Sequence, residues 1–471
     1  MNQPAPEAPM FLERVHTPGL AALSYVVGAD GGDAVVIDPR WDVDVYLDHL
    51  RAHGARLRWV LATHRHEDFV DGSRTLAALT GARAAHGGVE LTWGEPLDDG
   101  AVIELGDHLR LEALATPGHT LGHLAYVLYD TSTGDSPVGV FTGDALFVGD
   151  VGRADFYPDR AREVAGLLYE SLHDKLLPLG DHCLVWPAHG AGSVCGDAMA
   201  DRDFSTLGYE RRHNPRLQLP DRDAFIRAKL AEDHPQPPYF RRMEEVNGAG
   251  PRPLERLPEL RPVPAGDLAA RLDDDADDVV LLDVREPQAF GESHVPGALA
   301  IPADMLPSFA GWLIPGDAPI VLVADDAERA RDAARHLVRL GYERLDGYLQ
   351  GGITAWETAG RRLGHVPPIQ VAALSRGVER GDVTVLDVRS DGEWDAGHLR
   401  GATHVYLGEL PARLASGPPL PDDRPLVTLC GSGRRAIIAA SLLLRHGHDD
   451  VVNSFGSMAA CQSAGCPMGA S

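Results

Sequence analysis

"LATHRHEDFVDG", residues 61–72, places His64, His66 and Asp68 within five positions, directly after an apolar run. Imidazole and carboxylate groups are common ligands of zinc and iron in proteins. The stretch therefore predicts a metal-binding loop that begins where a strand ends. The residue that follows, Phe69, carries a side chain that cannot bind a metal.

Three further segments offer ligands: His119 in "TPGHTLGH", Asp144 in "FTGD" and His189 in "PAHG". A single histidine is more often a core or surface residue than a ligand. Here, however, each segment follows a strand-like run, and active sites gather on loops at the ends of strands. We expect the four segments to meet at one edge of a sheet.

The elements around these segments alternate over residues 10–205. "SYVVGADGGDAVVIDP" predicts a hairpin that turns at its Gly/Asp cluster. "LRWVLATH" predicts a strand that ends at the metal loop, and "SRTLAALTG" predicts a short helix closed by glycine.

Composition narrows the class of protein. The chain has 471 residues, 44% of them apolar, and a formal net charge of −26, which disfavours nucleic acid as a partner. No apolar run reaches 18 residues and the first residues do not resemble a secretory signal, so we expect no membrane span. Five cysteines are too few and too irregular for a disulfide framework, which favours a reducing cytoplasm.

The second half of the chain repeats itself. "VVLLDVREPQAFGESHVPGALAIP" (279–302) matches "VTVLDVRSDGEWDAGHLRGATHV" (383–405), and the segments 319–342 and 425–448 match without a gap. Strands alternating with helices predict doubly wound α/β domains with parallel sheets. The expected domains are 10–247, a Pro-rich linker at 248–264, 265–364 and 366–471.

The metal loop resembles the T-H-x-H-x-D-H motif of the metallo-β-lactamase superfamily, with Phe69 in place of the last histidine. The resemblance covers about residues 10–205 and implies an αββα sandwich with metal at one edge. "GDVGRADF" (149–156) follows Asp144 as the G-R-x-D-F segment does in persulfide dioxygenases. These iron enzymes look like glyoxalase II but oxidise a thiol persulfide to sulfite with O₂.

The loss of the final histidine leaves a poor second metal site. His64, His119 and Asp144 would still complete a first site of two imidazoles and one carboxylate, the facial triad of non-haem Fe(II) oxygenases. Zinc would also accept this set, so the ligands alone leave the metal open. By the resemblance we expect one Fe²⁺ per chain, with His66, Asp68 and His189 orienting ligands or water.

The same resemblance assigns two further residues. Arg153 is expected to help hold the persulfide, and Asp155 to be structural. Cys195, in "HGAGSVCG" after His189, stands where many single-domain relatives lack a thiol. A persulfide relay at Cys195 and a packed small hydrophobe are both open interpretations.

"PLVTLCGSGRRAII", residues 425–438, predicts a buried strand, a loop and the start of a helix, with Cys430 opening the loop. Backbone N–H groups and the helix dipole would favour the thiolate and its anionic persulfide. The cradle is formed by Gly431, Ser432, Gly433, Arg434 and Arg435.

The second repeat resembles rhodaneses, with Asp387 and Arg389 in their D-x-R strand end. Related phosphatases use the longer loop C-x5-R, so the six-residue loop here favours sulfur over phosphate. The first repeat has Ala324 in place of Cys430 and the acidic loop "ADDAER", and we expect it to be inactive.

Together these resemblances predict oxidation of a low-molecular-weight thiol persulfide by O₂ to sulfite, and sulfur transfer through Cys430 to give thiosulfate. The expected partners are the persulfide, O₂ and sulfite, with no nucleic acid and no membrane; by family analogy the chain would form a homo-oligomer. One alternative is a zinc thioester hydrolase of glyoxalase II type with sulfur-carrier domains. Another is a non-catalytic persulfide sensor or sulfur-carrier module.

Overall fold

The structure is a computed structural model that describes residues 9–196, 198–274, 278–417, 420–421 and 423–469. The last two residues of the expected 366–471 domain, and residues 275–277, lie outside the described part. Contacts divide the chain into one unit of Met1–Leu257 with Val338–Gly341, and a second of Pro258–Leu337 with Tyr342–Ser471. None of the helices in the described ranges is long and apolar enough to cross a membrane.

Two six-stranded sheets form the centre of the first unit. The first sheet has the order β1-β2-β3-β4-β5-β6, with strands at Met10–Thr17, Ala22–Ala29, Asp33–Ile37, Arg56–Leu61, Arg83–His86 and Glu95–Pro96. The second has the order β12-β11-β10-β9-β8-β7, with β7 to β12 at Val102–Leu105, Leu109–Ala115, Leu124–Asp130, Pro137–Gly143, Leu184–Pro187 and Ser205–Thr206.

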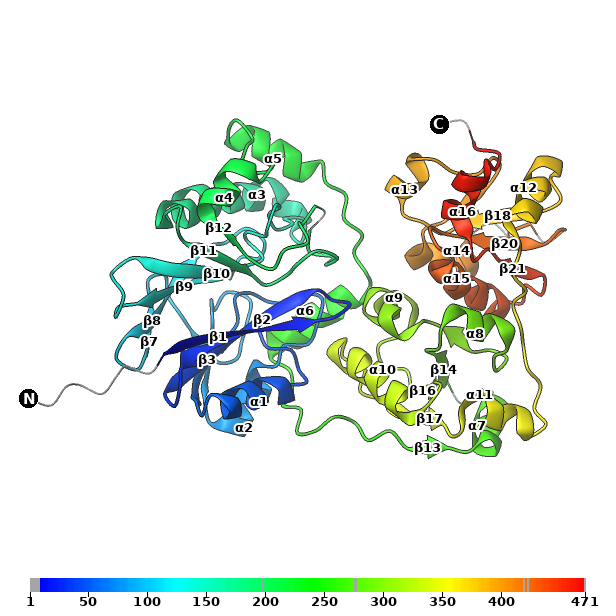
Figure 1. Cartoon of the computed structure of the whole chain (residues 1–471), viewed down its shortest axis with the longest axis horizontal. Coiled ribbons are helices and arrows are strands. Elements are labelled where there is room, and N and C mark those ends of the chain that lie inside the picture. Colours follow the sequence, from blue (N-terminus) through cyan, green and yellow to red (C-terminus); the bar gives the residue numbers. More distant parts are fainter. Residues whose placement is uncertain (1–8, 197, 275–277, 418–419, 422, 470–471) are drawn as a thin grey trace, which may run out of the picture. The chain divides into compact units, whose positions relative to one another are not determined.

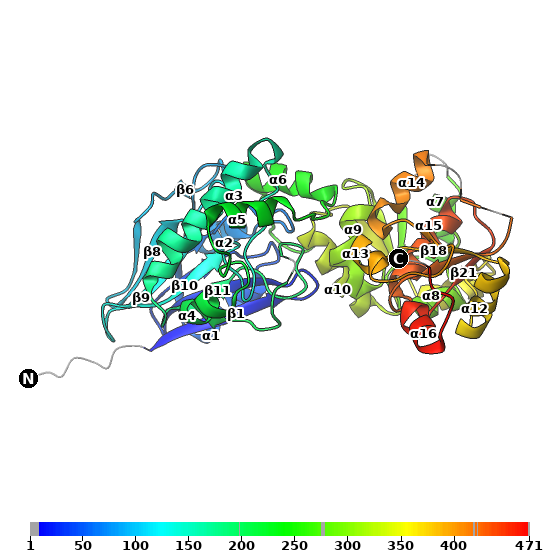
Figure 2. The same ribbon diagram turned by 90° about the horizontal axis from the view of Figure 1, so that it is seen from above.

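Alternation along the strands builds three apolar layers. In β2, Tyr25 and Val27 face the second sheet, whereas Val26 faces the helices on the outer side. The helices α1 (Asp44–Ala52) and α2 (Ser73–Thr80) cover the first sheet, and α3 (Ala161–Glu170) and α5 (Arg222–Leu230) cover the second (Figures 1 and 2). The first unit is thus the αββα sandwich that the resemblance to the metallo-β-lactamase superfamily implied. The helices α4 (Leu207–His213) and α6 (Tyr239–Ala249) complete it.

The local predictions around the metal loop are confirmed. β2 and β3 pair as an antiparallel hairpin. β4 ends at Leu61, three residues before His64. α2 ends at Thr80 and is capped by Gly81, whose φ of 74° is left-handed. The segments with His64, His119, Asp144 and His189 each follow the end of a strand.

The second unit contains two parallel sheets, one for each repeat. The first repeat has the order β13-β17-β16-β14-β15, with β13 to β17 at Pro262–Val263, Val280–Asp283, Leu299–Ala300, Ile320–Val323 and Leu345–Leu349. Its helices α7 to α11 span Ala265–Leu272, Pro287–Glu292, Leu306–Leu313, Ala327–Arg339 and Gly352–Thr358.

The second repeat has the order β19-β18-β20-β21, with β18 to β21 at Thr384–Asp387, Thr403–His404, Leu426–Leu429 and Val451–Asn453. Its helices α12 to α16 span Val371–Arg380, Asp391–Asp395, Leu410–Ser416, Arg434–Arg445 and Ser457–Ala464. Residues of α12 and α16 pack on one face of the sheet, and α15 contacts β20 and β21 (Figure 1). The predicted doubly wound arrangement is therefore present.

Candidate metal centre and candidate sulfur-transfer loop

Three buried side chains of the first unit bring ligand atoms together at the carboxyl ends of its strands. Asp144 Oδ2 lies 3.7 Å from His64 Nε2 and 3.4 Å from His119 Nε2. His119 Nε2 and Asp144 Oδ2 are buried without a hydrogen-bond partner. Buried polar atoms are normally paired, so two unpartnered acceptors that face each other fit a metal ion.

Neighbouring groups fix the orientation of both imidazoles. Thr63 Oγ1 donates to Asp38 Oδ2 at 2.8 Å and accepts from His64 Nδ1 at 2.8 Å, which leaves the lone pair of Nε2 for a metal. His119 Nδ1 lies 3.1 Å from the carbonyl oxygen of Arg153, with the same consequence. Asp38 adopts φ +51°, a strained value for a residue with a side chain, in order to reach Thr63.

The charge states of the three groups also suit metal binding. Burial holds the pKa of His64 well below its usual value and lowers that of His119 to about 4, so both imidazoles are neutral at pH 7. Burial by itself would raise the pKa of Asp144, but the contact with His189 holds it below its usual value. Neutral imidazoles and an ionised carboxylate are the forms that bind a cation.

His189 and Asp68 form the second half of the cluster. His189 Nδ1 lies 2.7 Å from Asp144 Oδ1, and its Nε2 lies 2.9 Å from Asp68 Oδ2. Burial would lower the pKa of His189, yet Asp144 and the other nearby anions raise it well above its usual value. His189 therefore acts here as a bridge that orients Asp144.

No role was predicted for His123, the last residue of "TPGHTLGH". The backbone N–H of Asp144 donates to His123 Nε2 at 3.1 Å, and His123 Nδ1 bonds Thr116 at 2.8 Å. Gly143 makes this possible, because a Cβ there would lie 2.5 Å from His123 Nε2, and its φ of +51° also favours glycine. The turn at Gly143 and Asp144 therefore packs directly against His123 of the "TPGHTLGH" segment.

Glu67 is a second residue that the sequence reasoning missed. The ligand atoms of His64, Glu67 and His119 all lie within 4.8 Å of one another. Its Oε2 is buried without a partner, 3.9 Å from His119 Nε2, whereas Oε1 accepts from Arg65 at 3.1 Å. Burial raises the pKa of Glu67 to about 8. The only signal in the sequence was an acidic residue at a variable position of the motif.

Phe69 fills space beside the cluster. Its ring centroid lies 4.3 Å from that of His66 and 6.4 Å from that of His189, and its side chain is fully buried. His66 Nε2 lies 3.2 Å from Asp38 Oδ1. His66 thus lies beside Asp38 and packs on Phe69, and both of its ring nitrogens are buried without a hydrogen-bond partner among the described residues.

The Arg153 side chain is largely committed to protein groups. Its guanidinium makes two hydrogen bonds to Asp155, at 2.7 and 2.6 Å, and donates to the carbonyl oxygens of Val194 and His234. These contacts leave its backbone carbonyl as the described link to His119. A direct contact of Arg153 with substrate stays a prediction.

Cys195 lies against His189, and its Sγ is within 4.8 Å of the ligand atoms of Asp68 and His189. Burial raises the pKa of the Cys195 thiol to about 12. A relay through Cys195 therefore stays a prediction, and it would have to remove a proton from a buried thiol.

Asn247 of α6 anchors the metal loop from a distant part of the chain. Its Nδ2 donates to the carbonyl oxygens of His66 at 2.6 Å and Phe69 at 2.8 Å, and its Oδ1 accepts the N–H of Asp71 at 2.9 Å. One buried amide thus satisfies three backbone groups of the loop.

In the second unit, Cys430 follows β20 and α15 begins at Arg434, as predicted. The buried Cys430 Sγ accepts the N–H of Gly433 at 3.0 Å. Gly433 has φ +93°, and a Cβ there would lie 2.6 Å from Phe455 Cα, so only glycine fits. At the end of the loop, Arg435 makes two hydrogen bonds of 2.7 Å to Glu393, which lower the pKa of Glu393 to about 2.

Ser457, which the sequence gave no reason to select, completes this site. Its Oγ accepts the N–H of Cys430 at 3.1 Å and lies 3.8 Å from Sγ. Its φ of +47° is rare for a residue with a side chain, and such strain is characteristic of functional sites.

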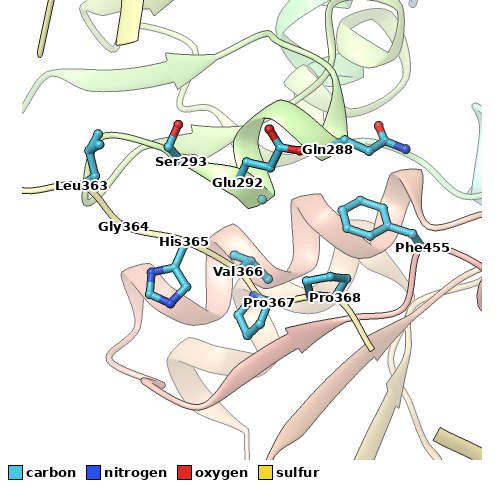
Figure 3. A pocket seen from close by; sticks show the side chains of 11 residues that line it. Gln288, Glu292, Ser293, Leu363, Gly364, His365, Val366, Pro367, Pro368 and Phe455 are labelled. Atoms are coloured by element: carbon cyan, nitrogen blue, oxygen red, sulfur yellow. The ribbon is translucent and has the colours of Figure 1, made fainter. Parts of the chain in front are cut away.

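A cavity of about 590 Å³ lies between the two repeats of the second unit (Figure 3). Val366, Pro367, Pro368 and Phe455 form its apolar wall, and Gln288 and Glu292 of α8 face them. None of the residues that line it is a cysteine. We therefore place no sulfur chemistry in this cavity.

Comparison with known families gives two matches. Residues 17–189 match the Metallo-beta-lactamase superfamily. Residues 264–359 and 370–464 each match the Rhodanese-like domain. The relatives and the fold of the first unit imply a bound metal, in keeping with the geometry of His64, His119 and Asp144.

Individual proteins of known sequence or structure are also similar to this chain. The mitochondrial persulfide dioxygenase ETHE1 of Bos taurus is 34% identical over 220 residues, which cover 45% of this chain and 78% of that protein. The cytoplasmic hydroxyacylglutathione hydrolase of Arabidopsis thaliana is 32% identical over 167 residues, covering 35% and 61%. A metallo-beta-lactamase structure from Staphylococcus aureus superimposes with a TM-score of 0.64 at 28% identity, covering 72% of this chain and 99% of that one.

Replacing Asn247 by alanine should loosen the metal loop. The change leaves three buried backbone groups unpaired, at about 1–3 kcal/mol each before the loop relaxes. We expect the melting temperature of the first unit to fall by at least about 3 °C in calorimetry, with loss of metal during dialysis against a chelator. Glu245→Ala, on the exposed side of the same helix, is the control. Equal metal retention in both variants would contradict the anchoring role of Asn247.

Proposed function

We propose that this chain oxidises a low-molecular-weight thiol persulfide with O₂ to sulfite. The chain belongs to the metallo-β-lactamase superfamily as a homologue of the persulfide dioxygenases, and it also carries two rhodanese-like domains. The observation that carries the proposal is the buried set of His64, His119 and Asp144, with two unpartnered acceptor atoms. Phe69 beside that set supports a single metal rather than two.

His64, His119 and Asp144 would hold one Fe²⁺, which would supply the O₂ chemistry that side chains lack. The protein contributes orientation. Thr63 and the carbonyl of Arg153 fix the two imidazoles, and His189 fixes the carboxylate. Phe69 and the buried walls exclude water from this side of the cluster.

The overall oxidation balances without a further reductant. R–S–S⁻, O₂ and H₂O give R–SH, SO₃²⁻ and H⁺; the outer sulfur loses four electrons, which O₂ accepts. The bond between the two sulfur atoms breaks, and the inner sulfur leaves as the thiol.

Sulfur transfer is proposed at Cys430 of the second repeat. The Cys430 thiolate attacks the outer sulfur of a persulfide, releases R–S⁻ and becomes Cys–S–S⁻. Sulfite then attacks that outer sulfur, so that thiosulfate forms and the thiolate returns. The Gly433 N–H lies where it stabilises negative charge on Sγ. The Ser457 hydroxyl donates to the carbonyl oxygen of Ser454 at 2.6 Å and accepts the N–H of Cys430, so it positions Cys430.

The alternative function is thioester hydrolysis at zinc, which is supported by the similarity to a hydroxyacylglutathione hydrolase. Phe69, in place of a ligand for a second metal, favours the oxygenase. A cytoplasmic location and a homo-oligomer are also part of the proposal.

We expect one iron per chain after anaerobic purification, measured by metal analysis, and O₂ uptake on glutathione persulfide. His119→Ala removes one of two imidazoles, so iron content and O₂ uptake should fall at least about 100-fold while thiosulfate:cyanide sulfur transfer remains. Two zinc ions per chain with thioester hydrolysis would support the rival instead.

Cys430→Ser should abolish sulfur transfer from thiosulfate to cyanide, because the hydroxyl is a poor nucleophile at neutral pH. Ser457→Ala should lower kcat for the same reaction by about tenfold, through loss of the hydrogen bond that accepts the Cys430 N–H and positions its thiol. Replacing Asp325 and Asp326 of the first repeat by asparagine is the control and should change little. Full activity in Cys430→Ser would show that the transfer site lies elsewhere.

The two activities should be coupled in one chain, since fusion raises the local concentration of each partner to roughly millimolar for short linkers. Under air, wild type should convert persulfide chiefly to thiosulfate. Cys430→Ser should consume O₂ at the same rate and accumulate sulfite. Separation of the products by chromatography decides the point, and equal thiosulfate from both proteins would mean that the domains do not cooperate.

A further inference from the structure

Both arginines of the Cys430 loop are paired with carboxylates, and one pair reaches across to the inactive repeat. Arg434 NH1 lies 3.0 Å from Glu286 Oε2, and its NH2 bonds Asp304. Glu286 directly precedes α8 and Asp304 lies in the short 3-10 turn Ala303–Met305, so both belong to the first repeat of the second unit. The sulfur-transfer steps described above use neither residue.

The charges at the loop do not favour anions in this state. Arg435 is held by Glu393, and Arg434 by Glu286 and Asp304, so three carboxylates face two guanidinium groups. The sulfur compounds that react at Cys430, thiosulfate and sulfite, are doubly charged anions. Such an anion at the start of α15 would be attracted by the helix N-terminus and by free arginine side chains, and repelled by these carboxylates.

The Arg434 pairs can be exchanged. The Arg434 side chain is 35% exposed and those of Glu286 and Asp304 are each 67% exposed. Exposed ion pairs are weak and screened by salt, so an incoming anion can displace them. The Arg435–Glu393 pair is more buried and is tied to the Ser390 capping box, so it is the less exchangeable of the two.

We propose that the first repeat is a selectivity element for the Cys430 site, in which Glu286 and Asp304 compete with anionic sulfur compounds for Arg434. The proposal rests on sulfur transfer at Cys430. It gives the cysteine-free repeat a task in the reaction, because its two carboxylates set the affinity of the site for sulfite and thiosulfate. Neutral thiols need no arginine and escape this competition.

The test is the double variant Glu286→Gln/Asp304→Asn in the full-length protein. At low ionic strength we expect the KM for thiosulfate and for sulfite to fall about two- to tenfold, with kcat within about twofold of wild type. The KM for dithiothreitol, a neutral acceptor, should not change. The difference between variant and wild type should shrink in about 0.5 M salt.

The control is Asp332→Asn, which breaks an exposed ion pair with Arg335 on α10 of the same repeat and should leave all KM values unchanged. Arg434→Ala should raise the KM for both anions and abolish the effect of the double variant. Unchanged or raised KM values for sulfite and thiosulfate in the double variant would overturn the proposal.

A binding measurement separates this inference from the proposed function. Calorimetric titration of Cys430→Ser with sulfite needs no turnover, and Glu286→Gln/Asp304→Asn in that background should tighten the Kd by a similar factor. If wild type showed no Cys430-dependent transfer, the proposed function would fail. If transfer were present but neither KM nor Kd responded to the two carboxylates, the inference alone would fail.

Discussion

A fully buried, ionised carboxylate at Asp144 is the constraint on which the first unit depends. An isolated charge in such a place costs several kcal/mol, so the surrounding chain must supply partners. His189 bonds one oxygen, His123 accepts the backbone N–H, and the other oxygen stays unpaired beside His64 and His119. His64 follows β4, His119 and His123 follow β8, and His189 follows β11, so these strand ends must meet for the carboxylate to be accommodated. The two sheets bring these strand ends together. Asp38 positions Thr63 beside His64, and Gly143 leaves room for His123.

The pattern of the sequence was sufficient for the architecture and for the motif residues. Period-two alternation, glycine turns and the internal repeat predicted the hairpin and the parallel sheets, because these follow from local rules. The αββα sandwich was implied by the resemblance of the metal loop to the metallo-β-lactamase superfamily. What lay beyond it were contacts between distant segments. Asn247 reaches the metal loop from 176 residues beyond Asp71, and Ser457 reaches Cys430 across 27 residues. Glu67 lies within the motif itself, but the sequence does not show that its side chain points towards His64 and His119.

The two repeats share one scaffold but differ at the loop that carries Cys430 in the second repeat. Both retain the buried Asp–Arg pair at the strand end, Asp283 with Arg285 and Asp387 with Arg389, so this pair belongs to the fold. At the following helix the repeats diverge. In the first, the Asp326 carboxylate accepts the N–H groups of Glu328 and Arg329, each at 2.8 Å. In the second, a backbone N–H of the loop is left for a sulfur atom. In the first repeat, the acidic loop thus caps the following helix at the place where the second repeat holds Cys430.

The anchoring of the metal loop by α6 bears on where this chain can be cut. The superfamily match ends at residue 189, yet the amide that holds His66 and Phe69 lies at 247, and Trp93 donates to the carbonyl oxygen of the same residue. A fragment trimmed to the matched region would keep His64, His119 and Asp144 but lose the Asn247 side chain that holds the loop in place. The evolutionary module and the folding module therefore end at different residues. Recombination that respects only the first would transplant a metal site without its support.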